Sequence, residues 1–425
     1  MNGLKKLMAL LLTVAVAAVF TGCTTFDNFK NAFFGDGQKE DVIIFGVLEP
    51  QSGSNAQFGK EEIEGIELAH EMYPEVLGKK IELVYEDTQS SIYVSEAAAE
   101  ELLAYNPTVI FGCYGNASAL AMADLLEKKK IPTVGISLTN TLLTENHKYY
   151  ATMSFNDTVQ GQSLAKYVNQ SLNSKNVAIF RQEDDETTAE VANKFEKEVK
   201  DLGTKIATKQ YFKLEETDFM PYLQQIRKSI ADTVFCPVGV EVADQLFTQA
   251  ENCMMTNLNF VGTTQWNNED FLKMMKKHPK IKAIVASDFA PEQLDTSISE
   301  QFLYAYKDKY GEEKEPSERA ALAFDGYIMA LKAIERAGKL DSELIMKEIL
   351  ATTAFEGVTG EISFDEYGMA HKPITINTVK NGSFQAVDIV KAKAAIKKDK
   401  DKEKSKKDTK KKTKKNTKNK SKKNN

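Results

Sequence analysis

Three hydroxyl residues stand where a parallel sheet would bring them together. Ser118 lies near the start of an amphipathic stretch at 117–130, and Ser137 and Thr139 follow a short apolar run at 132–136. The first turn of a helix carries unpaired backbone N–H groups and the positive end of its dipole, which favour an anion. The hydroxyls of Ser118 and Thr139 can donate to one carboxylate. The sequence therefore predicts a binding site for a small carboxylate.

The same residues also have structural interpretations. Ser118 can serve as a helix cap without any ligand, and Thr139 can be a turn residue. The sequence shows no nucleophile–base pair or phosphate loop, and the acidic run 183–186 is typical of a solvated face. Four isolated histidines and widely spaced cysteines argue against zinc, so we expect no enzyme, no metal and no cofactor.

Short apolar runs alternate with amphipathic stretches from residue 42 onward. This alternation is typical of βαβ units, and runs that are apolar throughout fit strands of a parallel sheet covered on both faces. The predicted strands are 42–48, 81–85, 108–112, 132–136, 176–180, 206–212, 233–236, 258–261 and 283–286. The predicted helices are 59–73, 91–105, 117–130, 158–172, 187–202, 217–229, 240–253, 267–277, 295–309, 316–336 and 342–350.

The length of the body, about 350 residues, exceeds what one hydrophobic core usually serves, so we expect two α/β lobes. The segment 149–155 is interpreted as a crossing between them, and 361–364 with 373–379 as a hairpin-like pair. Two lobes joined by several crossings place a ligand cleft at the carboxyl ends of both sheets. The predicted boundaries are 41–154 plus 288–358 for lobe 1 and 155–287 plus 359–389 for lobe 2.

The first residues indicate export. Two lysines precede an apolar run at 7–20, which ends in a threonine and then Gly22-Cys23. This order is typical of a secretory signal peptide, and the run is short for a transmembrane anchor, which needs about 20 apolar residues. Gly22-Cys23 resembles the lipobox of bacterial lipoproteins. We therefore expect a signal peptide at 1–22, a lipid on Cys23 and a linker at 23–40.

The last residues differ from the body in charge. Residues 391–425 contain 18 lysines against four acids, a net of +14, which leaves −20 for the rest of the chain. Such a segment cannot bury a core, so the tail at 390–425 is predicted to be disordered. It could bind anionic lipid or a cell-wall polymer, or be a solvated extension without a partner. Export argues against nucleic acid as a partner.

Seven motifs in fixed order resemble the periplasmic solute-binding proteins of branched-chain amino-acid (Leu/Ile/Val) ABC transporters. They are Gln51-Ser52-Gly53, Gln57-Phe58-Gly59, 112–123, 136–139, Gly262 with Trp266, 316–338 and 357–368. The resemblance covers about 42–385. It implies a type I periplasmic-binding-protein fold of two lobes, a small polar ligand in the cleft between them, and ABC permease subunits as partners.

The resemblance also assigns roles to individual residues. Ser118 and Thr139 would hold the ligand carboxylate, and Ser137 would offer its backbone carbonyl, so that its side chain carries little information. Asp157 aligns with an acid that faces the ligand's ammonium, although it could instead help cap the helix that begins near 158. Phe58 aligns with an aromatic residue over the ligand side chain, and its alternative is a core position.

Lobe 2 departs from the family pattern. Glu186 stands where amino-acid binders carry a tyrosine, Thr264 replaces an acid that pairs with the ammonium, and Gly239 replaces a second tyrosine. A buried ammonium needs a charge partner, which Asp157 or Glu186 would have to supply. The ligand is therefore an amino acid, another small carboxylate, an amide or something larger. Trp266 could stack on it or lie at a lobe surface.

Taken together, the sequence predicts an extracytoplasmic lipoprotein that captures a solute and delivers it to an ABC permease, with hinge closure of the lobes around the ligand. The alternative is a ligand-sensing or cell-wall-synthase-activating lipoprotein that kept the fold and acts through a protein partner.

Overall fold

The computed structural model describes residues 42–290 and 296–390, apart from the side chains of Glu186 and Thr187. The predicted signal peptide, the lipid-bearing Cys23, the linker and the tail from 391 lie outside the described residues and stay predictions. Within the described part of the chain, no helix is long and apolar enough to cross a membrane.

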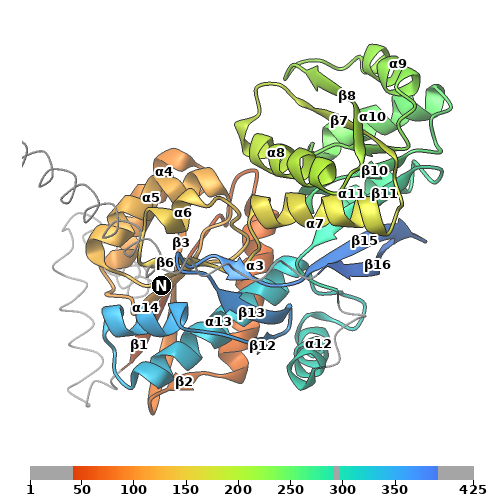
Figure 1. The fold of residues 1–425 in the computed structure, drawn as a ribbon. Coiled ribbons are helices and arrows are strands. Elements are labelled where there is room, and N and C mark those ends of the chain that lie inside the picture. Colours follow the sequence, from red (N-terminus) through yellow and green to blue (C-terminus); the bar gives the residue numbers. More distant parts are fainter. Residues whose placement is uncertain (1–41, 291–295, 391–425) are drawn as a thin grey trace, which may run out of the picture. The chain divides into compact units, whose positions relative to one another are not determined.

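The first sheet has six strands, and its core is parallel (Figure 1). Strand β4 lies between β1 and β5, with Phe45 opposite Val109 and Ile110 opposite Thr133 in parallel register. Strand β6 continues this parallel order beyond β5, and β2 pairs antiparallel with β3 at the other edge. The order is β2 (Glu75–Val76), β3 (Lys79–Asp87), β1 (Ile43–Glu49), β4 (Val109–Gly112), β5 (Thr133–Gly135) and β6 (Tyr150–Thr152).

The second sheet has seven strands, five of them parallel. Strand β15 joins it antiparallel to β11, and β16 pairs antiparallel with β15. The order is β16 (Ser383–Val390), β15 (Ile374–Lys380), β11 (Lys282–Ser287), β10 (Asn259–Val261), β9 (Thr233–Phe235), β7 (Asn176–Gln182) and β8 (Lys205–Phe212). A third, small sheet contains β12 (Phe355–Gly357), β13 (Gly360–Phe364) and β14 (Ala370–His371).

Helices connect the strands as the alternating pattern predicts. Those of the first half are α3 (Ala56–Met72), α4 (Ile92–Leu103), α5 (Asn116–Lys129), α6 (Leu142–Glu145), α7 (Asp157–Gln170), α8 (Glu186–Asp201) and α9 (Met220–Lys228). The remainder are α10 (Val240–Asn252), the 3₁₀ turn η1 (Thr264–Trp266), α11 (Glu269–Met275), α12 (Ser297–Tyr310), α13 (Glu318–Ala337) and α14 (Ser342–Leu350).

The sequence expectation of an α/β fold with two parallel-sheet lobes is confirmed, with two local corrections. Residues 361–364 and 373–379 do not pair with each other, because β13 pairs with β12 and β14 while β15 joins the second sheet. The segment interpreted as a crossing begins with a strand, β6, whose three residues are too few to show a pattern. The predicted lobe boundary at 358/359 lies inside the third sheet, and the boundaries stay a prediction.

Burial on both faces explains the unbroken apolar runs of the second sheet. In β9, Val234 packs in one hydrophobic cluster and its neighbour Phe235 in another. In β10, Phe260 likewise packs in the first of these clusters and Val261 in the second. Because successive side chains of a strand point to opposite faces, both faces of these strands must be apolar.

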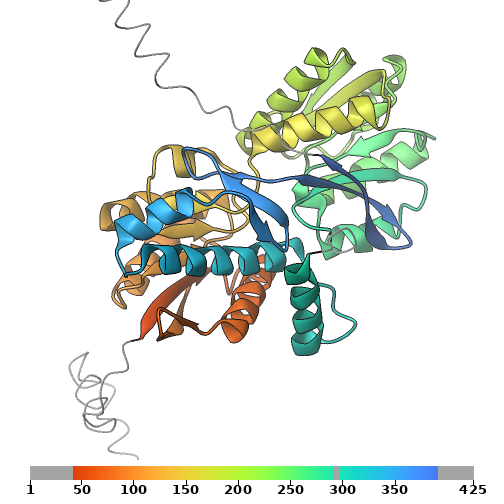
Figure 2. The same cartoon turned by 60° about the horizontal axis from the view of Figure 1, so that its bottom comes forward.

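Helix α13 packs against α3 and against strands of the first sheet. It runs alongside α3 (Figure 2), and nearly all of its residues are buried. A close approach of the two backbones depends on Gly65, since a Cβ there would lie 2.1 Å from the carbonyl oxygen of Ala320. The small residue at this point lets α13 lie against α3.

Replacing Gly65 with alanine should therefore destabilise the protein. The added methyl group overlaps with backbone that cannot rotate away, and overpacking of this kind costs about 1–3 kcal/mol. We expect a lower urea midpoint, although alanine is the better helix former. Lys60→Ala, at an exposed position of the same helix, is the matched control and should change stability by less than about 0.5 kcal/mol. Equal midpoints for the two variants would contradict the close-packing argument.

Candidate functional site

Ser118 lies in the first turn of α5, at the carboxyl edge of the first sheet. The helix N-cap is Gly115, which has no side chain to cap with, so Ser118 is not the capping residue. Its side chain is nearly buried, with 6% of the residue exposed. The arrangement leaves the hydroxyl and the first N–H groups of the helix close together, as a carboxylate site requires.

Thr139 is held beside this helix start by Asn116, a residue that the sequence analysis did not select. The Oδ1 atom of Asn116 accepts the backbone N–H of Thr139 at 3.1 Å and that of Asn140 at 3.2 Å. Its Nδ2 atom donates to Oγ1 of Thr139 at 3.2 Å. The sequence showed only an asparagine at a helix start. Its hydrogen-bond partners, Thr139 and Asn140, lie in a loop that is distant in the sequence.

Asp157 is the first residue of α7 and faces Thr139. The helix is capped by Asn156, whose Oδ1 accepts the N–H of Val159 at 2.9 Å, so the carboxylate of Asp157 is not the cap. Burial and the negative charge of Glu190 raise the pKa of Asp157 to about 7, against the opposing effect of the Thr139 hydroxyl. The structure thus brings two of the predicted ligand residues together, from the carboxyl edge of the first sheet and the start of α7.

Thr264 lies near the start of the same helix. Its backbone N–H donates to Oε1 of Gln160, in the first turn of α7, at 3.0 Å. Gly239 is the N-cap of α10, and a Cβ there would meet no atom within 4 Å. A side chain at position 239 would therefore start in open space.

Trp266 does not occupy either of its predicted positions. Its side chain is fully buried in the core of the second sheet, and its Nε1 donates to the carbonyl of Val238 at 2.7 Å. The ring packs against Phe271, with centroids 4.8 Å apart, and against Gly262. Its prediction as a ligand contact is corrected: the ring supports the 264–266 turn from the core side.

Two further predicted residues are placed in part. Ser137 is half-buried, and its hydroxyl is buried without a hydrogen-bond partner among the described residues. Glu186 is the first residue of α8, but its side chain lies outside the described residues, so its role stays a prediction.

Phe58 belongs to an aromatic cluster in lobe 1. Its ring lies 4.8 Å from that of Tyr114, and the guanidinium of Arg319 lies 4.5 Å from the Phe58 centroid and 5.4 Å from the Tyr114 centroid. Phe58 and Tyr114 are partly exposed, whereas Arg319 is 4% exposed. We call Phe58, Tyr114 and Arg319 the aromatic wall. The sequence analysis missed Tyr114 and Arg319.

Two buried carboxyl groups lie behind this wall. Glu49 and Glu62 are both fully buried, and the pKa of each is raised by burial. The pKa of Glu49 is raised further by the negative charge of Glu62, while the positive charge of Arg319 lowers that of Glu62. Glu49 accepts the backbone N–H of Tyr114 at 2.8 Å. Carboxyl groups this close and this buried are best satisfied when they share a proton.

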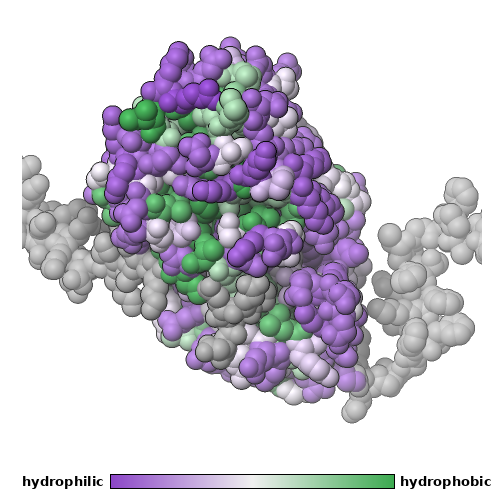
Figure 3. Space-filling view, turned by 90° about the vertical axis from the view of Figure 1, so that its right-hand side faces the viewer, coloured by the Kyte–Doolittle hydropathy of each residue, from purple (hydrophilic) through white to green (hydrophobic). Residues whose placement is uncertain are grey.

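A cavity of about 1140 Å³ is lined in part by Arg319. It is lined by acidic and aromatic residues of α3 and α12, by 311–319, and by parts of α11 and β16. Figure 3 shows one face of the molecule, where apolar residues gather between polar ones. Predicted ligand residues with described side chains do not line this cavity. We place the candidate site at the carboxyl edges of the sheets, where helix starts and hydroxyls converge.

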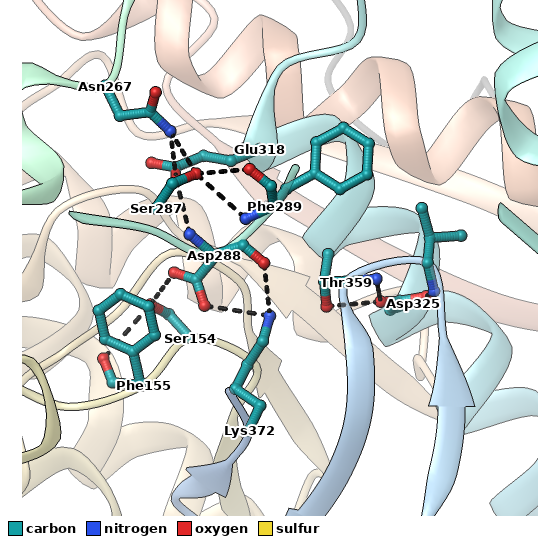
Figure 4. A network of polar contacts seen from close by, with 11 residues as sticks. Ser154, Phe155, Asn267, Ser287, Asp288, Phe289, Glu318, Asp325, Thr359 and Lys372 are labelled. Carbon is teal, nitrogen blue, oxygen red and sulfur yellow. Dashed lines mark hydrogen bonds and ion pairs between the residues drawn. The ribbon is translucent and has the colours of Figure 1, made fainter. Parts of the chain in front are cut away.

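A buried ion pair joins the chain segments that cross between the sheets (Figure 4). Lys372 Nζ lies 3.0 Å from Oδ1 of Asp288, and both side chains are almost completely buried. The hydroxyl of Ser154 donates to Oδ2 of Asp288 at 2.6 Å. These residues follow β6, β11 and β14, so one carboxylate ties three separate segments together.

Glu318, at the start of α13, extends this network (Figure 4). Its Oε2 accepts the N–H of Asp288 at 3.0 Å and the amide of Asn267 at 2.5 Å. Burial raises the pKa of Glu318 to about 7. Farther along α13, Asp325 accepts the N–H groups of Val358 at 2.6 Å and Thr359 at 2.8 Å. The first half of α13 therefore anchors the crossing segments.

The match to known families covers most of the chain. Residues 42–383 match the family model described as periplasmic binding protein. The chain belongs to this family. The fold of this family is a substrate-binding one, and its description places it in the periplasm.

Solved structures with the same fold agree with this assignment. The leucine binding protein LivK from Thermotoga maritima is 29% identical, with a TM-score of 0.74, and the match covers 82% of this chain and 99% of that one. LivJ from Streptococcus pneumoniae, in complex with isoleucine, is 27% identical with a TM-score of 0.72, covering 83% and 100%. A solute binding protein from R. palustris, in complex with 4-hydroxybenzoate, is 23% identical with a TM-score of 0.72, covering 85% and 100%.

The raised pKa values of Glu49 and Glu62 give a stability prediction. A carboxyl whose folded-state pKa is raised contributes stability that is full below its ordinary pKa of about 4.3 and is lost as pH rises through the folded value. Glu62→Gln removes one of the two acids and supplies an amide donor to Glu49. We expect the variant to become more stable relative to the wild type as pH rises from 4.5 to 8, as measured by the free energy of unfolding in urea.

Glu100→Gln, at an exposed position of α4, is the control and should follow the wild type at every pH. A difference between the Glu62 variant and wild type that does not change with pH would show that the two carboxyl groups do not share a proton.

The buried ion pair gives a second prediction. Lys372→Met leaves Asp288 buried without its cation, which should lower the free energy of unfolding by about 3–5 kcal/mol. Combining it with Asp288→Asn removes the uncompensated charge and should recover at least half of that loss in urea denaturation. Lys380→Met, at the exposed end of β15, is the control. If Lys372→Met costs no more than this control, the ion pair does not hold the crossings.

Proposed function

We propose that this protein is an extracytoplasmic solute-binding lipoprotein that captures a small polar ligand between its two lobes and delivers it to an ABC permease. The observation that carries the proposal is the meeting of Thr139 with Asp157 beside the start of α5, which contains Ser118. Helix N–H groups and hydroxyls suit the carboxylate of a ligand, and Asp157 suits a positive group.

An α-amino acid fits this pair of features best. LivK and LivJ, both more than a quarter identical to this chain, are a leucine binding protein and a protein in complex with isoleucine. Thr264 and the open space at Gly239 leave Asp157 as the described acid that faces the site. The R. palustris protein, in complex with 4-hydroxybenzoate, marks the alternative ligand class, a carboxylate without an ammonium.

The lipid on Cys23 and the tail from 391 complete the proposal. Anchoring would confine the binding protein to the membrane surface that holds its permease. A single acyl chain binds a bilayer only marginally, so the net +14 of residues 391–425 would add a second, electrostatic attachment to anionic lipid or cell-wall polymer.

The pKa of Asp157 separates the two ligand classes. An ammonium requires the charged carboxylate, so binding of leucine should release a proton and tighten by about tenfold between pH 6 and pH 8, as a group with a pKa of about 7 ionises. A benzoate brings a second negative charge and should bind more weakly over the same range. Isothermal titration of the full-length protein, in buffers of different ionisation enthalpy, measures both the dissociation constant and the proton count.

Asp157→Asn should weaken leucine binding and abolish its pH dependence. Asp201→Asn, at the exposed end of α8, serves as the control. Leucine binding that is independent of pH in the wild type would exclude Asp157 as the ammonium partner. The absence of binding across amino acids, amides and small carboxylates would contradict the proposed function itself.

A further inference from the structure

We propose that Arg319 is a positioning residue of the ligand site: its guanidinium holds Phe58 and Tyr114 in place and links this aromatic wall to the lobe-2 turn that contains Thr264. The inference rests on the proposed function for its effect on ligand affinity. Its structural part, the link to the lobe-2 turn, can be tested without any ligand.

The geometry of the wall is the first step. The guanidinium carbon lies 4.5 Å and 5.4 Å from the centroids of Phe58 and Tyr114, and the two rings lie 4.8 Å from each other. Each group therefore touches the other two. A desolvated cation against aromatic faces is among the stronger of these contacts, since water does not compete for the charge. The partly exposed rings owe their position to a cation that is itself buried.

The charge of Arg319 is secured by its surroundings. Burial would lower its pKa, but Tyr114, Glu318, Glu61 and Glu62 together raise it. Nη1 donates to Oε2 of Glu61 at 3.2 Å, in the helix that also contains Phe58. The Nε atom is buried without a hydrogen-bond partner among the described residues. In its position against the two rings, the Arg319 side chain therefore leaves one of its N–H groups without a hydrogen bond.

The link to lobe 2 runs through Asn267, which directly follows Trp266. Nη1 of Arg319 approaches the carbonyl oxygen of Asn267 at 3.5 Å, and the amide of Asn267 donates to the neighbouring Glu318 at 2.5 Å. The first turn of α13 therefore contacts both the backbone carbonyl and the side-chain amide of Asn267. A shift of the η1 turn would therefore also shift Arg319, which holds Phe58.

Trp266 is the chain's single tryptophan and so reports on this link directly. We would compare Arg319→Met, which keeps the length of the side chain and removes its charge, with Arg319→Lys, which keeps the charge and loses the planar fork. Arg336→Met is the matched control, because Arg336 lies on the same helix and bonds to Glu348 near the surface. All are measured in the full-length protein.

Without ligand, Arg319→Met should at least double the acrylamide quenching constant of Trp266 fluorescence, with Arg319→Lys intermediate and Arg336→Met unchanged. In titrations with leucine, Arg319→Met should raise the dissociation constant at least tenfold and Arg319→Lys less. Glu61→Gln, which loosens the guanidinium without removing it, should raise both quantities in the same direction and replaces Arg319→Met if that variant does not fold.

The two readouts keep the two proposals apart. If the wild type binds none of the amino acids, amides and small carboxylates, the proposed function fails while the quenching result still decides whether Arg319 holds the turn. If Arg319→Met, or Glu61→Gln in its place, is folded and matches Arg336→Met in both quenching and affinity, the positioning role is overturned.

Discussion

The structure depends on its buried carboxyl groups, because each of them requires a cation, a proton or several hydrogen-bond donors. Asp288 has Lys372, Asp325 has the N–H groups of Val358 and Thr359, and Glu318 collects donors from two neighbouring loops. Each solution joins segments that are distant in the sequence. The segments where the chain crosses between its sheets are therefore fixed by polar contacts. These contacts stabilise the fold much less when one partner moves away.

The same constraint shapes the candidate site. Lobe 1 buries Glu49 and Glu62 directly behind the aromatic wall, and Arg319 is the buried cation near them. The exposed face of this wall is aromatic, while its buried face is charged. Asp157 differs, since burial and the negative charge of Glu190 raise its pKa and no cation among the described residues pairs with it. A carboxyl left in this state can change its charge when a positively charged ligand arrives.

The sequence predicted the elements and missed the contacts that connect them. Apolar runs and helical stretches located the longer buried strands and helices, because strands buried on both faces leave a clear pattern, but they missed the short elements β2, β12, β14 and α6. Strand β6 escaped because three residues carry no period, and the second sheet gained β15 and β16 by antiparallel pairing that local pattern does not determine. Ser118 and Thr139 were selected because they follow strand ends, and their role as ligand residues stays a prediction. Asn116 and Arg319 were missed because their partners are far away along the chain. Trp266 was misplaced because a single aromatic residue gives no indication of which side of a turn it packs on.

The first turn of α13 shows why such distant contacts matter for function. Glu318 belongs to the network of the crossings and Arg319 to the aromatic wall, although they are adjacent in the chain. Both reach Asn267, the residue after the turn that presents Thr264. Since adjacent residues at the start of a helix cannot move independently, the crossing segments, the aromatic wall and the 264–266 turn are all joined to one rigid element. A displacement of Asn267 must then also disturb the rings of the aromatic wall. This coupling needs no long pathway, because it is contained in two neighbouring side chains.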